Sequence, residues 1–225
     1  MTFSLLARCA TTGRFGMVIS SSSPAVAARC AHARAGVGVA ATQNITDPTL
    51  GPRLLDLMAA GHSAHEAMSA IVASAPHIAY RQLLCIDAQG RTALHSGAHI
   101  LGTWNTAQGP GCVAGGNLLA HDGVPQAMVD AFAASSGTLG DRLIAALRAG
   151  RDAGGEAGPV HSAGLLMVDA DTWPCAELRC DWVDDTCPIE AVARAWQVYA
   201  PQMPAYLQRA RDPREAPSYG VPGNE

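Results

Sequence analysis

The order of predicted strands and helices constrains the fold of this chain more than any other feature of its sequence. Strand-length apolar or alternating stretches come in blocks, and pairs of helical patterns separate these blocks. The predicted strands are residues 2–9, 15–21, 36–43, 81–87, 91–96, 111–119, 163–169 and 176–183. The predicted helices are residues 50–60, 64–73, 124–134, 139–149 and 189–199. The first three strands are therefore expected before any helix.

This block order is not the strict strand–helix alternation of a doubly wound parallel sheet. It favours an α+β fold in which two mostly antiparallel sheets stack on each other and helices cover them. A length of 225 residues favours one large domain, which we place at residues 1–200. The Pro-rich segment 201–225 is expected to form a tail that packs on this domain or on a partner.

The helix that begins near residue 64 has a clear start signal. Ser63 is a favoured N-cap residue, and Glu66 three positions later completes a capping box.

Charge and hydropathy exclude several classes of partner. The formal net charge is -4 and the Arg residues are scattered, so no basic stripe could neutralise phosphates or anionic lipid. No apolar run is long enough to span a bilayer. Arg8 and Arg14 interrupt the first residues, which lack the apolar core of a secretion signal. We therefore expect a cytoplasmic protein without nucleic-acid or membrane partners.

The 15 basic residues counted as Lys and Arg are all Arg. Schiff-base catalysis, a pyridoxal-phosphate anchor and a phosphate-binding P-loop each need a side-chain primary amine, and none exists in this sequence. The single primary amine is the α-amine of the N-terminus. No cofactor is predicted.

The seven Cys residues do not indicate a disulfide scaffold or a metal centre. Their number is odd and they are spread over a long chain, which favours reduced thiols. Cys175, Cys180 and Cys187 lie close in sequence, but not at the CxxC spacing of a zinc site. No metal site is predicted, and no GxSxG elbow supports a nucleophilic Ser.

Five segments together resemble a known family, domain of unknown function 1028. They are the start MTFS, the stretch ARAGVGVAATQNITDPTLGPRLLDLMAAG, then YRQLLCIDAQGRTALHSGA, CVAGGNLLA and the ending APSYGVPG. That family is grouped with N-terminal-nucleophile hydrolases. The resemblance implies their four-layer αββα sandwich, in which two sheets lie between helical layers.

The resemblance also implies that Thr2 is the nucleophile once Met1 is removed. A Thr hydroxyl is a poor nucleophile at neutral pH, but an adjacent free α-amine with a pKa of roughly 8 can serve as its general base. The implied activity is hydrolysis of a small amide, imide or acylated amino acid. Alternatively, Thr2 simply begins a strand, and the chain is a non-catalytic small-molecule-binding or partner protein on the same fold. A homo-oligomer is expected in either case.

Polar residues at strand ends are the candidates for binding a substrate or an oxyanion. Gly116 would let the backbone approach a ligand, and the side-chain amide of Asn117 would donate to an oxyanion, although a Gly bulge and an Asn turn explain them equally well. The other candidates are Thr42 and Gln43 after a buried strand, Ser21 in the polar run 20–23, and Arg29 as a carboxylate clamp. Strand-end solvation and ordinary loops are the alternatives for these four.

Overall fold

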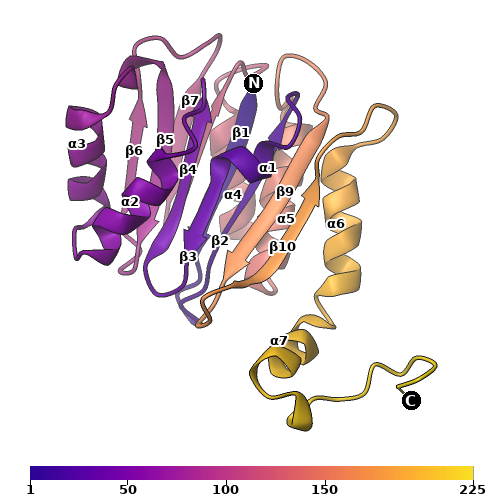
Figure 1. Cartoon of the computed structure of the whole chain (residues 1–225). Helices are drawn as coiled ribbons and strands as arrows, with labels where there is room; N and C mark the ends of the chain where they lie inside the picture. Colours follow the sequence, from indigo (N-terminus) through magenta and orange to yellow (C-terminus); the bar gives the residue numbers. More distant parts are fainter. Residues whose placement is uncertain (225) are drawn as a thin grey trace.

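The computed structural model describes residues 1–224 and contains two antiparallel sheets packed face to face (Figure 1). The six-stranded sheet has the order β10 (Pro174–Cys180), β9 (Ser162–Val168), β2 (Phe15–Ser21), β1 (Thr2–Arg8), β8 (Cys112–Asn117) and β7 (Asn105–Gly109). The four-stranded sheet has the order β3 (Ala31–Arg34), β4 (Gly38–Asn44), β5 (Arg81–Asp87) and β6 (Thr92–Ser96). Strand β1 is central, because it pairs with β2 on one side and β8 on the other.

Helices cover the outer face of each sheet. The smaller sheet is covered by α2 (Leu50–Ala59) and α3 (Ala64–Ser74), on the left in Figure 1. The larger sheet is covered by α4 (Val124–Ala134), α5 (Leu139–Asp152) and α6 (Pro188–Tyr199). The remaining helices are α1 (Val26–Cys30), α7 (Met203–Arg211) and two 3-10 turns, η1 (Ile78–Tyr80) and η2 (Pro213–Glu215). The predicted α+β four-layer sandwich is confirmed.

The core forms three apolar layers because both faces of the central strands are buried. In β1, Phe3 and Leu5 pack under α4 and α5, whereas Leu6 points into the space between the sheets. Successive strand residues point to opposite faces, so one strand contributes to two layers. The third layer lies between the smaller sheet and α2 and α3.

Most predicted elements are present with boundaries shifted by a few residues, and the capping box of Ser63 and Glu66 is confirmed. The expectation that three strands precede any helix is wrong, since α1 and β3 lie between β2 and β4. Strand β7 was also missed. Helix α1 has five residues and β3 has four, which is too short for a periodic pattern to be recognised.

The segment predicted as a tail contains a helix. Pro204 occupies the first turn of α7, where a missing backbone N–H costs nothing, so the Pro residues that suggested a tail are compatible with helix. Met203 and Leu207 of α7 are buried in the apolar layer that also contains α6. Residues 212–224 extend away from the two sheets (Figure 1).

Candidate functional site

The facing surfaces of the two sheets change from apolar to polar at the end where β1 begins. Along these strands, inward-facing residues such as Leu6, Ile19, Ala41 and Leu84 belong to the apolar layer between the sheets. The inward positions toward this end are instead polar, and we call them the polar layer: Thr2, Ser4, Ser21, Gln43, Gln82, Asn117 and Ser162. All seven side chains are buried. Buried polar groups are costly unless they are hydrogen-bonded, so this layer requires an explanation.

Thr2 lies in the middle of the larger sheet at this end. Its direct partner in β8 is Asn117, and in β2 it lies beside Ser21, the residue after the partner of Phe3. Thr2 is only 4% exposed, whereas Met1 is 37% exposed. The hydroxyls of Thr2 and Ser21 both donate to the carbonyl oxygen of Met1. Two hydroxyls therefore converge on an amide carbonyl at the head of β1.

A network of side-chain amides near Thr2 joins the two sheets. One backbone carbonyl determines which of these groups donate and which accept. The carbonyl oxygen of Gly116 can only accept, so the group that meets it at 3.2 Å must be Nε2 of Gln82. Oε1 of Gln82 then accepts from Nε2 of Gln43 at 2.8 Å and from Nδ2 of Asn117 at 3.1 Å. Gln43 completes the chain by accepting from the Ser4 hydroxyl at 2.9 Å.

The network uses one end of the Asn117 side chain and leaves the other end without a partner in the described part of the chain. One N–H of the Asn117 Nδ2 group donates to Gln82 Oε1, and the group carries a second N–H, so the donation of Asn117 to an oxyanion stays a prediction. Its Oδ1 atom is buried and finds no hydrogen-bond donor among residues 1–224. Asn117 therefore offers an unsatisfied acceptor, which suits an N–H group of a ligand or of the N-terminal amine.

The backbone directly after Asn117 is strained. Leu118 has a φ of 50°, a left-handed conformation that costs a bulky residue on the order of 1–3 kcal/mol. Two hydrogen bonds hold it there: its N–H donates to Leu101 O at 3.0 Å, and Ala157 N donates to its carbonyl at 3.0 Å. Strand β8 thus ends at Asn117. The loop of residues 153–161, between α5 and β9, is hydrogen-bonded to this end of the sheet, and we call it the 150s loop.

That loop brings in Glu156, which the sequence analysis did not single out. Glu156 is 4% exposed, and both of its carboxylate oxygens accept from the backbone N–H of Ser22 at 3.1 Å. Burial raises the pKa of the Glu156 carboxyl to about 7, while the Ser22 hydrogen bond and the positive charge of the Met1 α-amine act in the opposite direction. The one available signal was an isolated acid in a run of small residues, AGGEAG.

The pH dependence of stability should reveal this carboxyl. In the chain that keeps Met1, the pKa of this carboxyl is higher in the folded than in the unfolded state, so the folded state binds the proton more tightly and stability falls as pH rises from about 4.5 to about 7. Between these two pH values, the free energy of unfolding of Glu156→Gln should rise relative to that of the wild type by about 3 kcal/mol. Urea unfolding at several pH values measures the difference. Glu215→Gln, at an exposed position of η2, should run parallel to the wild type, and a parallel Glu156→Gln curve would contradict the assignment.

The other predicted site residues are placed as follows. Gln43 and Ser21 belong to the polar layer. Thr42 does not: it lies on the opposite face of β4, toward α2, and its hydroxyl donates to Asp47 O at 3.0 Å. Arg29 donates to the Ser23 hydroxyl and to Pro24 O, both at 3.0 Å, and so braces the loop after β2.

Gly116 allows a close approach of neighbouring protein atoms, and not of a ligand as predicted. A Cβ atom there would lie 3.0 Å from Thr2 O and 2.6 Å from the Leu119 side chain. A side chain at this position would therefore push β8 away from β1, and the glycine serves the packing of Thr2 against its neighbour.

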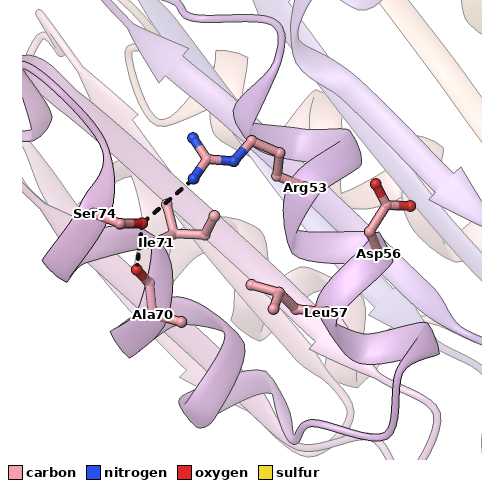
Figure 2. Close-up of a pocket in the computed structure, with 6 residues that line it drawn as sticks. All are labelled: Arg53, Asp56, Leu57, Ala70, Ile71 and Ser74. Carbon is pink, nitrogen blue, oxygen red and sulfur yellow. Dashed lines mark hydrogen bonds between the residues drawn. The ribbon is translucent and has the colours of Figure 1, made fainter.

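A cavity of about 330 Å³ lies elsewhere, between α2 and α3 (Figure 2). It is lined by Arg53, Asp56, Leu57, Ala70, Ile71 and Ser74. The Arg53 guanidinium donates to the Ser74 hydroxyl at 3.3 Å. This cavity is on the outer, helical side of the smaller sheet and contains no residue of the polar layer, so the polar layer is the better candidate for chemistry.

A sequence model described as a family of unknown function, DUF1028, matches residues 2–192. The chain belongs to this family. The matched region includes every residue of the polar layer and Glu156, and it ends within α6. Within residues 1–224, no helix combines the length and the apolar composition needed to cross a membrane.

A solved structure of a DUF1028 protein has the same fold. It is protein SPO2555 from Silicibacter pomeroyi, with 29% sequence identity, a TM-score of 0.82, and coverage of 88% of this chain and 89% of that one. More distant matches are Anbu (ancestral beta-subunit) from Yersinia bercovieri and Anbu from Hyphomicrobium sp. strain MC1. Their identities are 10% and 12% and their TM-scores 0.42 and 0.41; they cover 91% and 92% of this chain and 97% and 98% of their own. Likeness at that level does not establish a shared function. No curated protein sequence matches the chain.

Proposed function

We propose that this DUF1028 protein is an N-terminal-nucleophile amidohydrolase whose nucleophile is the hydroxyl of Thr2 after removal of Met1. The observation that carries this proposal is the place of Thr2: it is buried at the head of the central strand, and its hydroxyl and that of Ser21 meet the same amide carbonyl. A residue that merely begins a strand needs no such convergence.

The chemistry requires only groups at this end of the sheet. Removal of Met1 leaves a free α-amine on the residue that carries the hydroxyl, and the neutral amine accepts the hydroxyl proton as the oxygen attacks the substrate carbonyl. The amine then returns this proton to the leaving nitrogen, the C–N bond breaks, and an ester of Thr2 remains. Water hydrolyses the ester by the same proton transfers in reverse and releases the acid.

Ser21 and Asn117 take complementary parts. The Ser21 hydroxyl donates where the Met1 carbonyl now lies, so it is the candidate donor for the oxyanion of the tetrahedral intermediate. The free Oδ1 of Asn117 accepts from an N–H, which suits a substrate that keeps a hydrogen on nitrogen. These contacts support a small amide, imide or acylated amino acid as substrate.

The mature N-terminus is the first test. Intact-mass measurement and N-terminal sequencing of the protein from its natural host should show a chain that begins at Thr2. If Met1 remains on all of the protein, the hydroxyl has no amine beside it and the hydrolase proposal is excluded. In that case we would assign the chain as a non-catalytic small-molecule-binding or partner protein on the same fold.

A further inference from the structure

We infer that Glu156 is a positioning residue for the α-amine of mature Thr2: its carboxylate holds the amine beside the hydroxyl and stabilises its protonated form. This inference rests on the proposed function and adds a residue to its machinery. Glu156 is 154 positions away from Thr2 in the sequence, and the tertiary structure brings its carboxylate to the N–H of Ser22, the residue after the strand neighbour of Thr2.

The 150s loop runs along the start of β1. A Cβ atom on Gly155 would lie 3.3 Å from the Phe3 ring, and one on Gly158 would lie 3.8 Å from the Met1 side chain. Glu156 lies between these two glycines, and its carboxylate accepts from the N–H of Ser22, next to Ser21, whose hydroxyl donates to the Met1 carbonyl. The loop is held in register, because Ala120 N donates to Gly155 O at 3.0 Å.

The carboxylate needs a further donor. An ionised carboxylate has about four acceptor positions, and a buried one is unfavourable unless they are filled. The donor found on Glu156 is the backbone N–H of Ser22, which both oxygens share at 3.1 Å. An ammonium group on Thr2 would supply the missing hydrogen bonds and the opposite charge at once.

Few other charges act on this pair. In the chain that keeps Met1, the positive charge of the Met1 α-amine acts on Glu156 and on the Cys30 thiol of α1, and the imidazole of His161 also acts on Glu156. His161 is engaged elsewhere: its Nδ1 atom donates to Val183 O at 2.8 Å, and its ring stacks on Trp182. The nearby guanidinium of Arg29 is bound to the Ser23 and Pro24 loop. Glu156 is thus the carboxylate that can balance the amine.

The absence of Lys makes a direct test available, because the α-amine is the single primary amine of the chain. Reductive methylation with formaldehyde and cyanoborohydride, followed across pH by mass spectrometry of the N-terminal peptide, gives the midpoint at which the amine loses its proton. Removing an opposite charge within hydrogen-bonding range should lower this midpoint by about one pH unit or more in Glu156→Gln. Glu156→Asp, which draws the charge back by one methylene, should lower it by less, and Glu215→Gln should leave it unchanged.

The outcomes separate this inference from the proposed function. In a folded chain that begins at Thr2, an unchanged midpoint in Glu156→Gln overturns the inference and leaves the hydrolase proposal standing. Should the Gln variant fail to fold, Glu156→Asp decides in the same way, since an unshifted midpoint there also overturns the inference. An equal shift in Glu215→Gln would show a general charge effect and overturn it too. A chain that keeps Met1 in its natural host excludes the proposed function, and this inference with it.

Discussion

The mature protein carrying Thr2→Ala is expected to lose amide hydrolysis by a factor of about 10³ or more in kcat/KM. The reason is that the hydroxyl and its base belong to one residue, so no neighbour can replace them; Ser21 has a hydroxyl nearby but no amine of its own. A panel of small amides, imides and acylated amino acids, followed by mass spectrometry of the products, identifies a substrate, and the variant is then measured on it.

Two variants at the same position separate chemistry from packing. Thr2→Ser keeps the hydroxyl and the amine and should retain most of the activity. Thr2→Val keeps the β-branched shape in this buried strand and removes only the hydroxyl, so it should be inactive with near-normal unfolding. Turnover by Thr2→Ala at the wild-type rate would eliminate Thr2 as the nucleophile.

Gln82→Leu is expected to destabilise the fold by about 4 kcal/mol, because it breaks the network that joins the two sheets. Gln82 accepts from Gln43 and Asn117 and donates to Gly116 O and the Ser96 hydroxyl. Leu fills the space but leaves the buried amide donors of Gln43 and Asn117 without their acceptor, and each such group costs about 1–3 kcal/mol. Urea unfolding at constant pH measures this loss.

The matched control is Gln197→Leu, at an exposed position of α6, which should change the unfolding free energy by less than about 0.5 kcal/mol. Gln82→Glu retains both acceptor contacts and loses the donor to Gly116 O, so its cost should also be large. If Gln82→Leu lowers the unfolding free energy by less than about 1 kcal/mol, the amide network contributes little to the stability of the fold.

Elements with a long, clear period were predictable, and those without one were not. Strand β2 and helix α4 have the predicted bounds, since seven and eleven residues of consistent pattern give an unambiguous signal. Strand β7, with the sequence NTAQG, has few residues that favour a strand, and its place at the edge next to β8 decides its conformation.

The polar layer was predictable only in part. Thr2, Ser21, Gln43 and Asn117 stand at strand ends, where polar residues are visible in the sequence. Gln82 lies near the start of the correctly predicted strand 81–87, but the sequence analysis did not single it out as a site residue.

The sequence by itself determined the strands and helices that have a long regular period, because local period and capping are properties of neighbouring residues. It could not determine which residues face one another. Thr42 and Gln43 are adjacent, both faces of β4 are buried, and only the packing of the second sheet decides that Gln43 faces inward. The free atom of Asn117 and the approach of Glu156 to the N-terminus depend likewise on contacts between segments far apart in the chain, which no local pattern encodes.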